Sequence, residues 1–257
     1  MLKRLLPYKD LLLIFTWREF VIRYRQSLIG ILWAVLQPLS LMLLFTFIFS
    51  YILKMKISGL PYPVFFYAGL LPWTFFSSAL SYSIPSLTNH YNLITKIYFP
   101  REILPLSGIL VAFVDYLIAS LFFVVLLIIY HIPLAFAVLW LIPLFGLLFI
   151  FTISISLFLS GLNVYYRDIK LATGFLIQLW FFASPVMYSI DHIDMRFKLF
   201  LFLNPLTFII ENMRRVVIES RPVVLWQFAL VSLIIIVFYF LANRFFIKIE
   251  RAFADII

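Results

Sequence analysis

Six long apolar stretches, with lysine and arginine concentrated in alternate gaps between them, dominate this sequence of 257 residues. An apolar stretch of about 18 residues or more crosses the roughly 30 Å hydrocarbon core of a membrane as an α-helix, which makes all its backbone hydrogen bonds internally. Hydrophobic residues make up 65% of the chain and charged residues 12%, too few polar groups to cover a water-soluble surface. The sequence therefore predicts an all-α integral membrane protein.

The apolar stretches divide a single membrane domain, residues 1–257, into four parts. We predict a cytoplasmic segment with an amphipathic interfacial helix over 1–28, five spans over 29–189, a re-entrant pair of extracytoplasmic helices over 190–222, and a sixth span with a cytoplasmic tail over 223–257. The loops are too short to hold a soluble catalytic or nucleotide-binding domain. The six spans cover approximately residues 29–53, 62–87, 104–129, 134–159, 171–188 and 223–247.

Lysine and arginine mark one side of the membrane. The short loops on the opposite side hold only Lys54 and Lys56. By the positive-inside rule both termini are therefore cytoplasmic, and the long fifth loop counts little because long loops translocate regardless of charge. We expect no removable signal peptide, because residues 1–10 precede no short apolar core with a small-residue cleavage site. The basic residues on the cytoplasmic side are Lys3, Arg4, Lys9, Arg18, Arg23, Arg25, Lys96, Arg101, Arg167, Lys170, Arg244, Lys248 and Arg251.

The net charge of +9 does not indicate a nucleic-acid partner. The basic residues lie beside spans, where anionic lipid headgroups account for them. The lack of cysteine excludes disulfides, thiol chemistry and cysteine metal sites. The chain contains no G-x-x-x-x-G-K-[S/T] loop and has 7 glycines in all, so we expect no phosphate-cradling loop and no cofactor in it.

The fifth loop, residues 190–222, contains a stretch apolar enough to resemble another span. The pair Asn204-Pro205 interrupts it, because proline removes a backbone donor and disfavours helix in the residue before it. Glu211 and Arg215 are spaced to pair on one helical face, which lowers the cost of burying them. We predict two short helices that dip into the outer face; an interfacial hairpin with solvated charges is the alternative.

Residues 7–25 mix apolar and charged positions in a way that favours a helix along the cytoplasmic surface. Arg18 lies on a polar face, and Glu19 is spaced to pair with Arg23. This helix either floats on lipid or presents its polar face to a cytoplasmic partner. The apolar stripe consists of Leu13, Trp17, Phe20 and Tyr24.

The second and fourth loops are further candidate contact elements on the cytoplasmic side. The second loop contains Asn92, Lys96 and Arg101 and leads into the third span. The preferences of a helix start explain this loop as well as a docking site does. The fourth loop is a tight link whose charges, Arg167 and Asp168, can pair with each other or with lipid headgroups.

Short motifs lie at the span ends in a fixed order along essentially the whole chain. They are residues 25–30 with Trp33 and Pro38, Gly69 with Trp73, residues 99–102, Asn163 with residues 166–168, Ser184-Pro185, and residues 204–206. Together they resemble the polysaccharide-export permeases of the ABC-2 class, in particular the Wzm type, the membrane subunit of O-antigen exporters. The order of the motifs is more specific than any one of them.

This resemblance implies a homodimer that works with two copies of a Wzt-like cytoplasmic ATPase in the bacterial cytoplasmic (inner) membrane. Together they would move a polyprenyl-linked polysaccharide outward, and ATP and Mg²⁺ would be bound by the partner chain. The resemblance also implies that the helix around Arg18 and Glu19, and the second loop with Asn92, Lys96 and Arg101, receive the ATPase stroke. Teichoic acid and capsule permeases are near relatives of this class.

A path for sugar chains needs flat stacking surfaces without deep binding, because sugars present C–H faces and hydroxyl rims. Aromatic residues on the first, second and fifth spans supply such surfaces, although aromatics also anchor spans and fill helix contacts. Pro38 is a structural or gating candidate, and Gly30 and Gly69 are expected to permit close helix approach. The path candidates are Trp33, Phe45, Tyr62, Phe65, Phe66, Trp73, Phe76, Trp180, Phe181 and Tyr188.

Asp115, near the middle of the third span, is the one acidic residue predicted that deep. An intramembrane carboxylate is either a functional group, such as a proton relay, or a structural one that hydrogen-bonds a neighbouring helix. We favour the structural reading, since proton coupling usually involves further intramembrane titratable groups.

Three other functions are less consistent with the sequence. A membrane-embedded transferase needs convergent carboxylates or a histidine base, whereas His90, His131 and His192 lie in or beside loops, with Asp191 and Asp194 as the one acidic pair nearby. A secondary transporter more often shows internal repeats. Export of a small drug or a lipid stays within the ABC class, and substrate stimulation of the ATPase would separate it.

Overall fold

The computed structural model describes residues 2–25, 27–54, 61–190, 193–250 and 253. Predictions that involve Lys56, Asp191, His192 and Arg251, and the residue at position 26 of the first motif, lie outside this part of the chain. Every element in the described part is helical, as predicted. The elements are α1 (Leu2–Leu5), η1 (Leu6–Tyr8), α2 (Lys9–Tyr24), η2 (Gly30–Leu32), α3 (Trp33–Thr46), η3 (Phe47–Ile52), α4 (Tyr62–Ser83), α5 (Ser86–Asn89), α6 (Tyr91–Lys96), α7 (Ile103–Ile129), η4 (Phe136–Trp140), α8 (Leu141–Tyr165), α9 (Asp168–Phe182), α10 (Met195–Phe202), α11 (Pro205–Ile218) and α12 (Leu225–Ile249).

Five helical stretches are long and apolar enough to cross a membrane. They cover 30–52, 62–83, 103–129, 136–165 and 225–249, and they match the predicted first, second, third, fourth and sixth spans. The predicted fifth span is occupied by α9, which has 15 residues. This helix ends at Phe182, before the predicted end at 188, because proline at 185 disfavours helical geometry in the residue before it.

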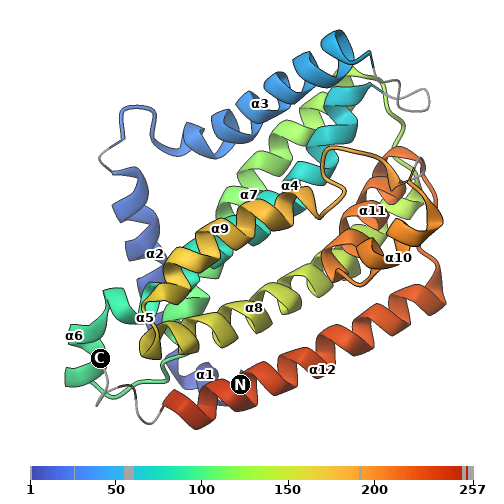
Figure 1. Cartoon of the computed structure of the whole chain (residues 1–257). Helices are drawn as coiled ribbons and strands as arrows, with labels where there is room; N and C mark the ends of the chain where they lie inside the picture. The colour runs from blue at the N-terminus through green and yellow to red at the C-terminus, as the bar shows by residue number, and fades with distance from the viewer. Residues whose placement is uncertain (1, 26, 55–60, 191–192, 251–252, 254–257) are drawn as a thin grey trace.

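Helix α4 is the centre of the bundle. Its apolar window is 78% buried, against 17–28% for the other four spans. It packs against α3, α7, α8 and α11, while α12 packs against α8 on the outside (Figure 1). The other spans leave wide apolar faces exposed, which in a membrane contact lipid or another subunit.

The two ends of the bundle carry different elements. Helices α1, α5 and α6, the α8–α9 turn and the end of α12 lie together at one end, and α10 and α11 lie at the other (Figure 1). The first of these ends also carries Arg4, Lys96, Arg101, Arg167, Lys170 and Lys248, basic residues that the positive-inside rule assigns to the cytoplasm, whereas Arg23 reaches Asp115 in the middle of α7. We therefore refer to it as the cytoplasmic end, and to the opposite end as the outer end.

A helix pair forms in the fifth loop where the sequence predicts one. Helix α11 begins directly after Asn204, whose side chain accepts a hydrogen bond from the Leu206 backbone N–H, and Pro205 occupies its first turn. The buried side of α11 packs against α4 and α8 at the outer end. How deeply α10 and α11 enter the membrane stays a prediction.

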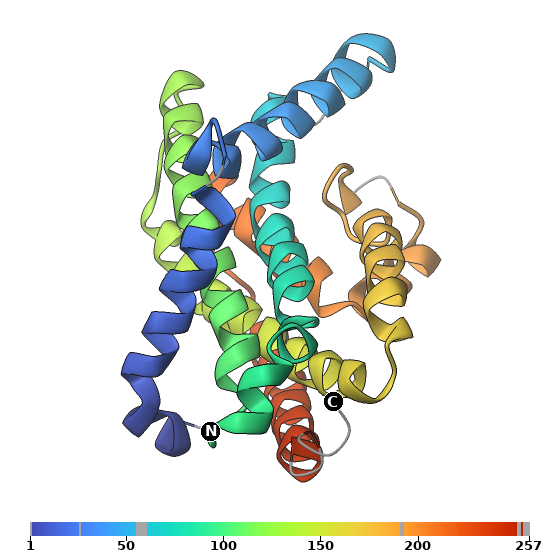
Figure 2. The same cartoon turned by 90° about the vertical axis from the view of Figure 1, so that its left-hand side faces the viewer.

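Helix α2 runs beside α7 and does not lie apart from the bundle (Figure 2). The connection from α2 to α3 passes through Gly30, whose φ of 58° lies in the left-handed region that glycine adopts readily. A Cβ at this position would meet no atom within 4 Å. Gly30 therefore serves the turn, and the predicted role in close helix approach is wrong for it.

Candidate functional site

A cavity of 510 Å³ lies between α3, α4, α7 and α9. We call it the groove. Three small hydroxyl side chains of α4, two glutamines and several aromatic rings line it, so hydrogen-bonding groups and flat apolar surfaces alternate within one space. Pro38, predicted as a structural or gating residue, also lines it from α3. The polar residues of the lining are Gln37, Thr74, Ser77, Ser78 and Gln178.

The hydroxyl groups of α4 reach the groove because their spacing places them on one helical face. Two of their O–H groups donate to backbone carbonyls one turn earlier: Thr74 Oγ1 lies 2.9 Å from the Leu71 oxygen, and Ser77 Oγ lies 3.3 Å from the Thr74 oxygen. The hydroxyl oxygens keep lone pairs that accept hydrogen bonds. The groove can therefore receive hydrogen bonds from a hydroxylated ligand without burying an unpaired donor.

Three of the predicted path residues line the groove together. Phe45 of α3, Trp73 of α4 and Phe181 of α9 come from three different helices. The ring centroid of Phe181 lies 6.2 Å from that of Phe45 and 5.5 Å from that of Trp73. These rings form a continuous aromatic wall, the surface that a sugar C–H face stacks on.

The remaining predicted aromatics of α4 are buried between helices. Tyr62 is 4% exposed and donates a hydrogen bond to the Met187 carbonyl at 3.1 Å. Phe66 stacks on Phe45 behind the groove, with 4.9 Å between centroids, and Phe76 packs against α8 and α9. Phe65 holds the Arg214 guanidinium, as described below.

The other predicted aromatics lie at the edges of the bundle. Trp33 is half exposed at the start of α3. Trp180 packs on Phe76, at 5.1 Å between centroids, on the side of α9 away from the groove lining. The Tyr188 hydroxyl donates to the Phe182 carbonyl at 3.1 Å, which ties down the chain that follows α9.

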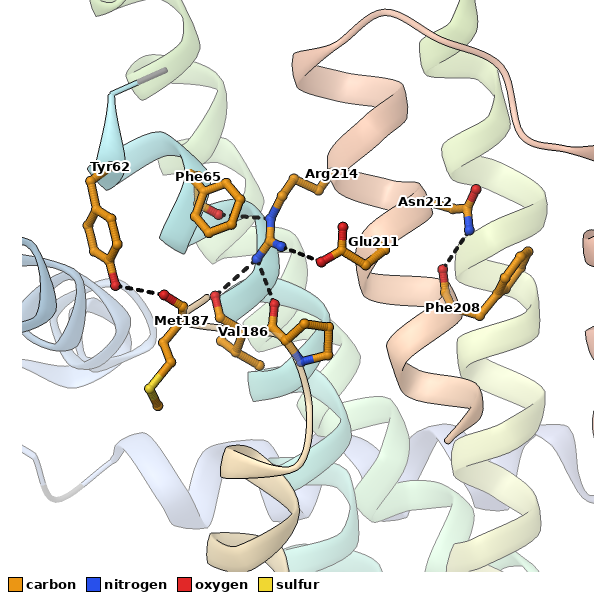
Figure 3. A network of polar contacts seen from close by, with 9 residues as sticks. Tyr62, Phe65, Val186, Met187, Phe208, Glu211, Asn212 and Arg214 are labelled. Atoms are coloured by element: carbon orange, nitrogen blue, oxygen red, sulfur yellow. Dashed lines mark hydrogen bonds and ion pairs between the residues drawn. The ribbon is translucent and has the colours of Figure 1, made fainter. Parts of the chain in front are cut away.

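Arg214 of α11 anchors the outer end of the bundle (Figure 3). Its Nε donates to the Phe65 carbonyl at 3.2 Å, and its Nη2 donates to the carbonyls of Pro185 and Val186 at 2.9 and 3.0 Å. The guanidinium carbon lies 3.7 Å from the centroid of the Phe65 ring. Its Nη1 makes an ion pair with Glu211 at 2.8 Å. One side chain thus joins α4, α11 and the chain after α9.

Two sequence predictions are resolved at this anchor. The predicted ion pair joins Glu211 to Arg215, whereas the ion pair that the structure describes joins Glu211 to Arg214, one residue earlier. The close approach predicted at Gly69 is between the backbone of α4 and the Arg214 side chain of α11. A Cβ there would overlap Arg214 Nη2 and would lie 3.1 Å from the Val186 oxygen, so the missing side chain makes room for the guanidinium.

Asp115 binds the end of α2 to the middle of α7. Its carboxylate oxygens accept a hydrogen bond from Arg23 Nη1 at 2.7 Å and one from the Tyr24 hydroxyl. The Arg23 guanidinium also lies over the Tyr82 ring of α4, 4.4 Å from its centroid. Arg23 and Asp115 both line the groove. The arrangement supports the structural reading of this carboxylate.

The predicted contact elements meet at the cytoplasmic end. Glu19 of α2 pairs with His90, at the α5–α6 junction, across 3.1 Å, and not with Arg23 as predicted. This hydrogen bond raises the pKa of His90 and lowers that of Glu19. Arg101 contacts the end of α6 through the Ile94 carbonyl at 3.4 Å. Exposed at this end are Arg18, Asn92, Lys96, Arg167 and Asp168.

The fold and the groove define a multi-pass helical membrane protein with a partly open space between its central helices that is lined by aromatic rings and by polar side chains. The chain belongs to the ABC-2 type transporter family, which matches residues 10–218. Within the described residues no group of three or more histidine, aspartate or glutamate side chains is placed to hold a metal ion.

Named relatives cover most of the chain. An O-antigen export system permease protein RfbA of Klebsiella pneumoniae is 32% identical over 206 residues, 80% of this chain and 79% of the relative. The RfbA of Myxococcus xanthus is 31% identical over 229 residues, 86% and 85% of the two chains. The polysialic acid transport protein KpsM of Escherichia coli is 26% identical over 208 residues, 79% of each.

Proposed function

We propose that this chain is the transmembrane permease subunit of an ABC exporter that moves lipid-linked polysaccharide, the O-antigen of lipopolysaccharide, across the bacterial cytoplasmic membrane. The observation that carries the proposal is the groove, in which α4 hydroxyls and two glutamines face an aromatic wall. Rings stack on sugar faces while hydroxyl and amide groups exchange hydrogen bonds with sugar hydroxyls, and none of these contacts needs a fixed charge. Such a lining lets successive units slide.

The working assembly is a homodimer with two copies of a Wzt-like ATPase. ATP and Mg²⁺ are bound by that partner, so the chain itself is not an enzyme. Helix α9 serves as the remaining membrane crossing, which gives six crossings with both termini in the cytoplasm. The exposed residues Arg18, Asn92 and Lys96, together with Arg101, form the surface that meets the ATPase.

Capsular or teichoic polysaccharide is the second candidate cargo, which the similarity to the polysialic acid transport protein favours. The two cargoes differ in charge, because polysialic acid carries a carboxylate on each sugar. Among the described residues that line the groove, Arg23 is the one cation, and it is already paired with Asp115 at 2.7 Å. A neutral polymer therefore fits this lining better than a polyanion.

The test is O-antigen display in cells that lack their own exporter, with this chain and its ATPase supplied together. Trp73→Ala and Phe181→Ala should each lower display several-fold at equal membrane levels of the protein. Phe136→Ala is the matched control, because that ring is 91% exposed and lies outside the groove. Display that persists with an ATPase unable to hydrolyse ATP would refute the proposal.

A further inference from the structure

A second cavity, of 530 Å³, opens at the cytoplasmic end where α5 and α6 meet the α8–α9 turn. We call it the foot pocket. Its charged residues in the described lining are Arg167 and Lys170, both cationic, and neither has an ion-pair partner among the residues that the structure describes. The other polar side chains of the lining are Thr88, Tyr91, Asn163 and Tyr165.

Asn163 fixes the walls of the foot pocket relative to one another. Its Nδ2 donates to the Ile84 carbonyl and to Thr88 Oγ1, each at 3.3 Å, and its Oδ1 accepts from the Lys170 backbone N–H at 3.1 Å. One buried amide thus joins α8, the α4–α5 connection and the first turn of α9. The elements that carry the two cations are therefore held in place by hydrogen bonds between helices.

The foot pocket lies below the groove on the same face of α9. Lys170, Ile177 and Phe181 are spaced by seven and four residues, which places them on one helical stripe. Ile177 and Phe181 line the groove, and Lys170 lines the foot pocket. With a rise of about 1.5 Å per residue, Lys170 lies roughly 10 Å below Ile177 along α9.

The position of the pocket selects a ligand in the headgroup layer of the membrane. Leu171, directly after Lys170, is 75% exposed, so the lipid-facing apolar surface of α9 begins where the cations end. Lipid phosphates lie at this boundary and attract basic side chains. A guanidinium binds phosphate through two parallel hydrogen bonds, and the ammonium and phenol groups add further donors.

We propose that the foot pocket binds the phosphate end of a membrane lipid and that, if the proposed function holds, this lipid is the carrier of the exported polysaccharide. Arg167 and Lys170 neutralise the phosphate, and the hydrocarbon chain lies along the exposed side of α9. The glycan attached to the phosphate then starts at the foot of the groove, below the aromatic wall.

The experiment measures lipid binding to the purified full-length chain in detergent by native mass spectrometry, without ATP or the ATPase. The probes are a polyprenyl diphosphate, phosphatidylglycerol, and uncharged polyprenol as the lipid without phosphate. The variant is Arg167→Gln with Lys170→Gln. Its matched control is Arg244→Gln with Lys248→Gln, which removes two exposed cations at the cytoplasmic end of α12.

The wild type and the α12 control should bind polyprenyl diphosphate far more tightly than polyprenol. The Arg167→Gln, Lys170→Gln variant should bind it about thirtyfold more weakly, which corresponds to about 2 kcal/mol, or about 1 kcal/mol for each cation lost. Lys170→Arg, which keeps the charge, should bind close to the wild-type level. Each variant is used only if it elutes as a single monodisperse species, so misfolding cannot imitate lost binding.

Equal binding of the diphosphate by the wild type and the Arg167→Gln, Lys170→Gln variant would overturn the site. If a separate pull-down with the ATPase shows that this variant keeps its lipid but no longer retains the partner, the pocket is a protein contact and the proposal is equally wrong. Equal competition by phosphatidylglycerol would support a phosphate site but reject the carrier as its occupant. Because binding is measured without transport, failure of the site leaves O-antigen display, the test of the proposed function, untouched.

Discussion

Replacing Gly69 with alanine tests whether the Arg214 anchor sets the stability of the outer end. The new methyl group would overlap Arg214 Nη2, which donates to two backbone carbonyls at 2.9 and 3.0 Å. Arg214 is 4% exposed, and Val186 and Phe65 beside it are buried, so no water can accept a hydrogen bond from the displaced N–H group. The guanidinium must move and lose at least one of these bonds.

The expected cost follows from the bonds at risk. One charge-assisted hydrogen bond contributes about 1.5–3 kcal/mol, and the carbonyl left buried without a donor costs about 1–3 kcal/mol more. Alanine returns about 1 kcal/mol through its higher helix propensity in the interior of α4. Gly69→Ala should therefore lower the free energy of unfolding by about 1.5–5 kcal/mol after these opposing terms are combined.

The assay is reversible unfolding of the purified chain in mixed detergent micelles, followed by tryptophan fluorescence. Gly146→Ala is the control, because it also adds a methyl group within a helix but meets no atom within 4 Å. Adding Arg214→Lys to Gly69→Ala should cost less than the sum of the two single changes, since a flexible lysine leaves room for the methyl group. If Gly69→Ala unfolds like Gly146→Ala, the anchor does not bear the stability assigned to it.

Two further predictions concern ion pairs at the cytoplasmic end. Arg4 contacts the buried carboxylates of Glu102 and Glu250 at 3.4 and 2.6 Å, and Arg4→Ala leaves both without this cation. Because Arg4 is partly exposed, the free energy of unfolding should fall by about 1–2 kcal/mol. Burial raises the pKa of Glu102 and the Arg4 charge opposes this, so the stability deficit of Arg4→Ala should shrink as the pH falls from neutral and Glu102 becomes protonated; a deficit that grows would contradict the arrangement. For the Glu19–His90 pair, the raised pKa of His90 means that its contribution to folding stability is complete below the ordinary histidine pKa of 6.5. This contribution is lost as the pH rises through the raised pKa. The lowered pKa of Glu19 means that its contribution to folding stability is complete above the ordinary glutamate pKa of 4.5 and is lost as the pH falls through the lowered pKa. The thermal midpoint of the wild type should therefore exceed that of His90→Gln most between 4.5 and 6.5, and a pH-independent difference would refute the ion pair.

Hydropathy and charge were sufficient to predict the helical class and most of the spans. Apolar length decides whether a segment crosses the membrane, and this signal is local, so five predicted spans match five long helices. The prediction was too long for the fifth span. Residues 183–188 are apolar enough to extend it, but Pro185 interrupts the backbone and Val186 and Met187 instead fold over the outer end, where they are buried.

Partners separated in sequence could not be predicted in the same way. The spacing of Glu19 and Arg23, and of Glu211 and Arg215, suggested pairs within a helix, because i, i+4 geometry is all that a single helix reveals. For Glu19 and Arg23 the structure offers partners from other segments, His90 and Asp115, whereas Glu211 pairs within α11 but with Arg214. No local pattern predicts the role of Arg214 either, because its three carbonyl acceptors lie at positions 65, 185 and 186.

The aromatic candidates show the same limit at the level of single residues. Trp73 and Phe76 lie less than one turn apart on α4, yet Trp73 lines the groove and Phe76 packs between α8 and α9. Composition identifies both as ring surfaces, whereas the side each one faces depends on how α4 is rotated within the bundle. That rotation is fixed by contacts such as the one between Gly69 and Arg214, which no local pattern encodes.

Helix α4 therefore connects the outer end to the groove through its own rigidity. Gly69, where Arg214 holds it, lies one helical turn from Trp73, and Trp73 contacts Phe181 on α9. The same guanidinium binds the carbonyls of Pro185 and Val186, just beyond the end of α9. Arg214 thus joins α4 to the chain just beyond α9, and these are two of the three helices that carry the aromatic wall, so we expect a movement of α11 that releases Arg214 to change the spacing of Trp73 and Phe181. In this fold the position of α11 is therefore linked to the groove through the contacts of one side chain.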